Sequence, residues 1–220
     1  MHLETSSNLY GVTVNPFDRL LTSGGSSGGE GALIGLRGSC LGVGSDIGRL
    51  IEYQVCAILS TECLTGGSIR SPAANNGLYG LRPTTRRIPV VGSAAPQIGS
   101  GYVEGVLGPL SASLGGIKLF MKTVLDAKPW VNDPSLVPIP WRDEQAYLNQ
   151  DSRTAFRVAV LWDDGVVKPH PPITRALKEV VKRLSGIPGI EVVEWKPYKH
   201  DLAWELIVSF ITLSFQPNST

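Results

Sequence analysis

Cysteine is scarce in this sequence, and what little there is does not suggest pairing. Three cysteines stand at Cys40, Cys56 and Cys63, an odd number without paired spacing, so no disulfide framework is predicted. The three histidines are far apart in the sequence, and none stands at metal-ligand spacing from a cysteine. The sequence therefore predicts no metal site.

Long apolar runs and clusters of one charge are also missing. The longest apolar stretches are too short to cross a bilayer, and the first ten residues lack the charged and apolar segments of a signal peptide. With 20 basic and 19 acidic residues and no basic run, neither nucleic acid nor a membrane is an expected partner. These absences make the cytoplasm the expected compartment.

The chain is nevertheless rich enough in apolar residues, at 42%, to bury a core of one or two domains. Residues 11–117 are rich in Gly, Ser and Pro, which predicts short strands and tight loops with few long helices. Apolar residues recur at helical spacing over 117–125 and again over 172–184. The second of these helices lies between strand candidates at 157–162 and 190–195, and this order predicts an α/β sheet with crossover connections.

The most informative segment is the glycine-serine stretch LTSGGSSGGEGALI at residues 21–34. A flexible linker would not turn into an apolar segment directly after Glu30. A Walker A loop needs a lysine, and none precedes Lys118; the fit to a dinucleotide fingerprint is also poor. The spacing differs from that of a Gly-x-Ser-x-Gly elbow, and no histidine stands where a Ser-His-Asp triad needs one. If these serines are catalytic, they require a different base.

Two further glycine-rich motifs follow, GVGSDIG at 42–48 and GGSIRSPAANNGLYGLRPT at 66–84. Together with the first motif they resemble the amidase-signature family, and the ordered match covers residues 21–84. A looser likeness continues over 103–141, within which 119–141 is most similar to the acetamidase-type general amidases of fungi. The resemblance implies an α/β fold, with a mixed β-sheet core flanked by α-helices.

The resemblance also implies a Ser-Ser-Lys mechanism for hydrolysis of small carboxylic amides to acid and ammonia, without any cofactor. Ser68 would be the nucleophile, and Ser26 the bridging serine after a cis peptide bond at Gly25. A serine hydroxyl is a weak nucleophile that needs a positioned proton acceptor. A neutral, desolvated lysine can be that acceptor, and a bridging hydroxyl can relay the proton to the leaving nitrogen.

Further residues take supporting roles under the same resemblance. The backbone N–H groups of the oxyanion hole would come from Ile47, Gly48, Gly67 and Ser68. Hydrogen-bonding or ion-pairing support is expected from Ser27, Asp46 and Arg70. Asn75 and Asn76 are expected to satisfy turn backbone, and Cys40 is predicted to be a small buried hydrophobe rather than a nucleophile.

The sequence departs from the family pattern in three ways. The 25 residues before Ser26 contain no lysine, although the family's base lies upstream. Residues 49–66 interrupt the run Asp-Ile-Gly-Gly-Ser, and the chain is shorter than a family member. We therefore expect residues 1–220 to form a partial amidase-signature domain, incomplete at both ends, with a signature core at 11–117 and the start of a following α/β portion at 118–220.

Two origins remain open for the insertion at 49–66. Its 18 codons could be a retained short intron, because Gly48-Arg49-Leu50 can be encoded with a donor-like GTAGGT and Thr65-Gly66 with an acceptor-like ACAG. Val208-Ser209 can likewise be encoded with a donor-like sequence. The alternative is a tolerated surface loop, which its place in the oxyanion turn disfavours.

Three functions are compatible with these features. The first is an amidase that forms an acyl-enzyme on Ser68. The second is a relative of the amidotransferases that release ammonia from glutamine, which the acetamidase-like stretch disfavours. The third is a non-catalytic fragment or the product of a faulty gene model, which we favour for the polypeptide as written.

Overall fold

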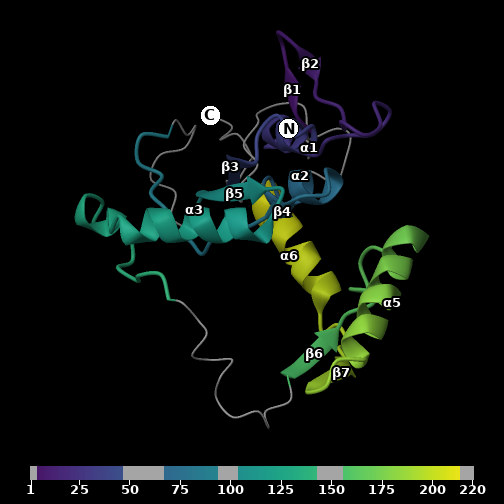
Figure 1. Ribbon diagram of the computed structural model, residues 1–220. Helices are drawn as coiled ribbons and strands as arrows, with labels where there is room; N and C mark the ends of the chain where they lie inside the picture. The colour runs from purple at the N-terminus through teal and green to yellow at the C-terminus, as the bar shows by residue number, and fades with distance from the viewer. Residues whose placement is uncertain (1–3, 47–66, 94–103, 143–155, 214–220) are drawn as a thin grey trace. The chain divides into compact units, whose positions relative to one another are not determined.

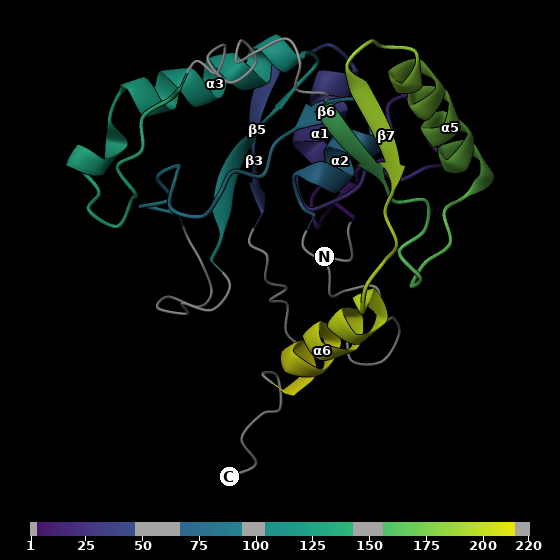
Figure 2. The same cartoon turned by 90° about the horizontal axis from the view of Figure 1, so that it is seen from below.

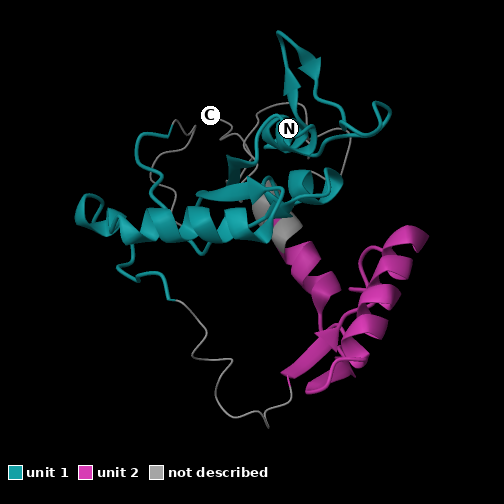
Figure 3. Cartoon of the chain, viewed as in Figure 1, with its two compact units in different colours: residues 1–142 teal, residues 143–220 magenta. Residues whose placement is uncertain are grey.

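A computed structural model describes residues 4–46, 67–93, 104–142 and 156–213 of the chain (Figure 1). The chain forms two compact units, Met1–Arg142 and Asp143–Thr220, which Figure 3 distinguishes by colour. The predicted insertion at 49–66 lies outside the described residues.

The first unit combines short strands with three helices among its described residues. In chain order its elements are β1 (Ser6–Ser7), β2 (Gly11–Val12), α1 (Gly28–Gly35), β3 (Leu41–Asp46), α2 (Arg70–Asn75), β4 (Tyr79–Gly80), β5 (Val106–Ser111), α3 (Leu114–Asp126) and the 3-10 turn η2 (Pro129–Val131). Within 11–117 the strands have at most six residues and only the start of α3 belongs to a longer helix, as the Gly, Ser and Pro content predicted.

Strand β5 is the centre of the three-stranded sheet β3-β5-β4, in which both neighbours run antiparallel to it. The β3–β5 register runs from Leu41 opposite Ser111 to Asp46 opposite Val106. A core cluster forms where α1, α2 and the residue before α2 contribute apolar side chains beside this strand: Ile34, Ile69, Ala73, Val106 and Leu110. Burying these side chains supplies the apolar contribution that holds α1 and α2 beside β5.

Helix α3 contacts β5 (Figure 2). It buries Met121 and Leu125 on one face, in a second core cluster with Ile88. The predicted helix at 117–125 is thus confirmed, and it begins earlier because Ser113 caps it: the Gly116 N–H donates to the Ser113 hydroxyl over 3.1 Å.

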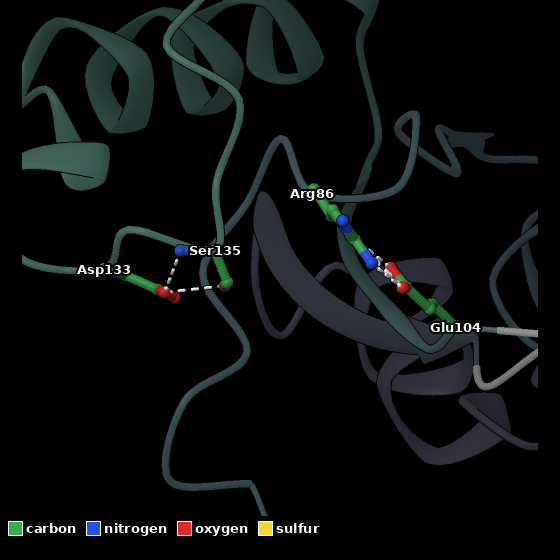
Figure 4. Close-up of polar contacts among 4 residues, drawn as sticks. All are labelled: Arg86, Glu104, Asp133 and Ser135. Carbon is green, nitrogen blue, oxygen red and sulfur yellow. Dashed lines mark hydrogen bonds and ion pairs between the residues drawn. The ribbon is translucent and has the colours of Figure 1, made fainter. Parts of the chain in front are cut away.

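Two polar contacts order the loops around this helix (Figure 4). Arg86 donates to both carboxylate oxygens of Glu104, and these hydrogen bonds lower the pKa of the Glu104 carboxyl. Asp133 accepts from the N–H of Ser135 over 3.0 Å and from its hydroxyl over 2.6 Å. The Arg86–Glu104 pair is exposed, so its effect on stability is small.

The second unit contains β6 (Phe156–Val160), α5 (Pro171–Ser185), β7 (Ile190–Glu194) and α6 (His200–Leu213). Strands β6 and β7 pair in parallel, in register from Phe156 opposite Ile190 to Val160 opposite Glu194, and α5 packs on β7. The strand-helix-strand order predicted from the sequence is confirmed. The helix begins with two prolines, Pro171 and Pro172, in the first turn, where a helix tolerates proline.

One prediction about packing was wrong. Cys40 was expected to be buried, but its side chain is exposed. Cys40 directly precedes β3, and its main chain is held by hydrogen bonds. The Cys40 carbonyl accepts from the Ser111 hydroxyl over 2.8 Å and from the Ala112 N–H over 3.4 Å. Because the backbone rather than the side chain is anchored, the thiol remains exposed at the surface.

Candidate active site

Ser26 lies in the loop that leads into α1. Gly24, two residues earlier, has a φ of 79°, and an added Cβ there would lie 2.9 Å from the Pro72 nitrogen, so both conformation and space require glycine. The Gly25–Ser26 peptide bond is cis, as the family resemblance implied. Gly25 is buried and Ser26 is half-buried, so the loop holds its serine at the edge of the packed region.

Ser68 lies in a second loop, directly before α2. Its neighbour Gly67 is buried, and Ile69 on its other side is fully buried in the core cluster beside β5. The Ser71 N–H donates to the Gly67 carbonyl over 2.6 Å, which closes the turn around Ser68. Ser68 itself is half-buried, so its main chain is anchored on both sides.

A backbone hydrogen bond joins the two serine loops. The Ser27 N–H donates to the Ser68 carbonyl over 3.0 Å, although the two residues are 41 positions apart. The Ser27 hydroxyl also donates to the Ser45 carbonyl over 3.2 Å and accepts from the Ser45 N–H over 3.2 Å. Ser27 therefore connects three segments: its own loop, the end of β3 and the Ser68 turn.

Asparagine side chains add further bridges between the same parts of the chain. Asn76 is buried, and its side-chain amide donates to the Ser23 carbonyl over 2.8 Å and to the Pro72 carbonyl over 2.7 Å. Asn15 donates to the Asn75 carbonyl over 2.7 Å. Asn76 thus does more than complete a local turn, because it ties the chain before Ser26 to the helix after Ser68.

Asp46 ends β3 and is fully buried. Its carboxylate lies 3.7 Å from the Nε of Arg82, and the side chain of Arg82 is 28% exposed. A carboxylate without water is costly unless a cation or hydrogen bonds compensate it, so this ion pair supports the strand end next to the signature turn. Arg82 was not predicted as a supporting residue, although it belongs to the GLRPT motif. Arg70 stands at the first position of α2 and is exposed.

The predicted oxyanion donors are only partly described. Gly67 and Ser68 belong to the described chain, whereas Ile47 and Gly48 lie outside it. Within the described ranges, no cluster of three or more His, Cys, Asp or Glu side chains could hold a metal ion. Among the helices searched there, none is long and apolar enough to cross a membrane.

The three-stranded sheet, the helices that contact it and the two linked serine loops define an α/β domain. The profile of the family described as Amidase matches residues 1–49 and 60–220, and the chain belongs to this family. The unmatched residues 50–59 lie inside the predicted insertion.

Individual relatives agree with this assignment. The amidase-family protein C550.07 of Schizosaccharomyces pombe is 46% identical over 207 residues, which are 94% of this chain and 34% of that protein. The acetamidase of Aspergillus oryzae is 40% identical over 208 residues, covering 94% of this chain and 35% of the acetamidase. Among solved structures, a fatty acid amide hydrolase superposes with a TM-score of 0.78 at 39% identity, covering 100% of this chain and 37% of the hydrolase. The chain therefore spans about a third of the relatives it matches.

Proposed function

We propose that this chain contributes the nucleophile and the bridging serine of an amidase that hydrolyses small carboxylic amides to acid and ammonia. The observation that carries the proposal is the hydrogen bond from the Ser27 N–H to the Ser68 carbonyl, 3.0 Å long. It holds the residue next to Ser26 against Ser68 itself. The similarity to acetamidases over 94% of the chain favours an amide as the substrate.

In the proposed reaction, the Ser68 oxygen attacks the amide carbonyl carbon and its proton passes to Ser26, which in turn delivers a proton to the base. The C–N bond then breaks as the base gives its proton back to Ser26 and Ser26 passes a proton to the nitrogen, so ammonia leaves and the acyl group remains on Ser68 as an ester. Water attacks the ester by the same proton route and releases the acid. Ser27 orients both loops through its three hydrogen bonds.

Charge that develops on the substrate oxygen requires donors already in place. We propose that the N–H groups of Gly67 and Ser68 contribute, together with those of Ile47 and Gly48. The buried Gly67 has no side chain to keep a substrate carbonyl away from its backbone. Asp46, held at the end of β3 by Arg82, supports the strand from which Ile47 and Gly48 continue.

The base in this proposal is a lysine upstream of Ser26, and residues 1–25 contain none. In the closed, water-poor environment of an active site a lysine loses its proton more readily than in water, because burial disfavours its charged form. Such a lysine can accept the proton that Ser26 relays.

A completed chain tests this function. It consists of this sequence without residues 49–66, extended at both ends with the corresponding parts of the Aspergillus oryzae acetamidase. We expect it to release ammonia from acetamide and to be labelled by a fluorophosphonate on Ser68, located by peptide mass spectrometry. A label on another serine, or none while ammonia is released, would contradict the assignment of Ser68.

Transcripts test the proposed origin of the insertion. If residues 49–66 are encoded by a retained intron, reads of the mature transcript should encode Asp-Ile-Gly-Gly-Ser without interruption and should continue differently after Ile207. The gap in the family match at 50–59 supports this expectation. Reads that contain all 18 codons in most transcripts would show instead that the insertion is a genuine part of the protein.

A further inference from the structure

The side chain of Thr5 lies within hydrogen-bond distance of three main-chain groups of the Ser26 loop. Its Oγ1 is 3.2 Å from the Gly24 carbonyl oxygen and 3.1 Å from the Ser26 carbonyl oxygen. The Gly28 N–H donates to the same Oγ1 over 2.9 Å. One hydroxyl therefore contacts the chain before Ser26, Ser26 itself and the first residue of α1.

A threonine hydroxyl has one proton to donate and two lone pairs to accept. Thr5 can accept from the Gly28 N–H while it donates to either the Gly24 or the Ser26 carbonyl. Gly28 lies close to this hydroxyl, since a Cβ built on Gly28 would collide with the Thr5 Oγ1. The absence of a side chain at Gly28, a glycine of the signature motif, thus leaves the space that the Thr5 side chain occupies.

The Thr5 main chain is anchored independently of its side chain. The Thr13 N–H donates to the Thr5 carbonyl over 2.8 Å, close to the pairing of β1 with β2. A substitution of the side chain leaves this bond possible. The Thr5 hydroxyl can therefore be removed without removing the anchor of the segment that carries it.

The Ser26 loop is consequently held by two different sets of bonds. Ser27 ties it to Ser68 and Ser45, and Thr5 ties it to the segment before β1 and to the start of α1. Without the Thr5 hydroxyl, the Gly28 N–H loses its acceptor, and the Gly24 or Ser26 carbonyl loses its donor on that side. Proton relay requires the hydroxyls to lie within hydrogen-bond distance of each other. A small shift of the Ser26 loop therefore lowers the rate of proton transfer.

We propose that Thr5 is a positioning residue that fixes the main chain on both sides of Ser26 for proton transfer. The proposal deepens the proposed amidase function and rests on it for its catalytic consequence. Thr5 was not singled out in the sequence, where it stands 21 residues before Ser26.

The variants that test this are Thr5→Val, which keeps the shape and removes the hydroxyl, and Thr5→Ser, which keeps the hydroxyl. Thr123→Val is the matched control, because Thr123 is an exposed residue of α3. In the 220-residue chain, we expect Thr5→Val to speed hydrogen exchange of the Gly28 amide by about tenfold, as loss of one hydrogen-bond partner implies. Thr5→Ser and Thr123→Val should leave this exchange within about twofold of the parent.

In the completed chain, we expect Thr5→Val to lower kcat for acetamide by about 10–100-fold with little change in KM, because the loop is misplaced rather than the substrate. Thr5→Ser should restore most of kcat. Faster Gly28 exchange with unchanged kcat would reduce Thr5 to a structural role and overturn the proposal. So would unchanged exchange at Gly28, whatever the turnover.

Failure of the proposed function gives a different result. A completed chain without Ser68-dependent turnover would contradict the amidase assignment and, with it, the catalytic role of Thr5. Amide exchange in α3 identifies loss of folding of the first unit: if Thr5→Val speeds exchange there as much as at Gly28, the hydroxyl supports the whole unit, and the positioning role is wrong.

Discussion

Ser68→Ala in the completed chain is expected to lower kcat for acetamide by about 10⁴–10⁶, the cost of losing a member of a catalytic triad that acts as a unit. Alanine has no oxygen to attack the carbonyl, so no acyl-enzyme forms. Ser68 is half-buried in a turn fixed by its neighbours, so the substitution should leave the fold intact. Ammonia release under substrate saturation measures the effect.

Ser26→Ala should produce a loss of similar order, because the relay from Ser68 to the base is interrupted. Since the two serines act in one proton path, the double variant should be little worse than either single one. Ser185→Ala, in an exposed position at the end of α5, is the control and should retain full activity. Additive losses in the double variant would show that the two serines do not share a path.

The second large effect concerns the 220-residue polypeptide by itself, which we expect to release no measurable ammonia from simple amides. Its first 117 residues contain no lysine that could accept the proton from Ser26, and residues 49–66 separate Gly48 from Gly67. Loss of one oxyanion donor raises the activation free energy by about 2.7–4 kcal/mol. Closing an 18-residue loop costs only roughly 2.5 kcal/mol, so the insertion harms geometry more than folding.

Stepwise repair separates these causes. Deletion of residues 49–66 alone should not restore turnover, whereas deletion combined with the flanking acetamidase segments should restore it. Fluorophosphonate labelling of Ser68 should follow the same order. Turnover by the unmodified 220-residue polypeptide that Ser68→Ala abolishes would contradict this expectation and would mean that another group replaces the lysine.

The sequence alone predicted those parts of the fold that depend on local patterns. The apolar spacing in α3 and α5 and the β-branched runs of β6 and β7 are each visible within a few neighbouring residues. The parallel pairing of β6 with β7 followed from the helix between them. The family motif singled out Ser26, Ser27, Asp46 and Ser68 because glycines surround them in a recognisable order.

The residues that hold the site together were less visible, because their partners are distant in the sequence. Thr5 lies about 20 residues from the groups it contacts, Asn76 is 53 residues from Ser23, and Arg82 is 36 residues from Asp46. No local pattern marks a threonine or an asparagine as a bridge. The exposure of Cys40 was missed for a related reason, since only the turn geometry shows that its backbone, and not its thiol, is anchored.

These long bridges have a consequence for synthesis on the ribosome. The Ser26 loop is complete once residue 28 has been translated, but its partner Ser68 and its central strand β5, which ends at Ser111, follow much later. At about 5–20 residues per second, the delay is on the order of several seconds. During this interval the apolar face of α1 and the glycine-rich loop have no partner strand, so the nascent chain exposes apolar surface that favours aggregation until β5 has been translated.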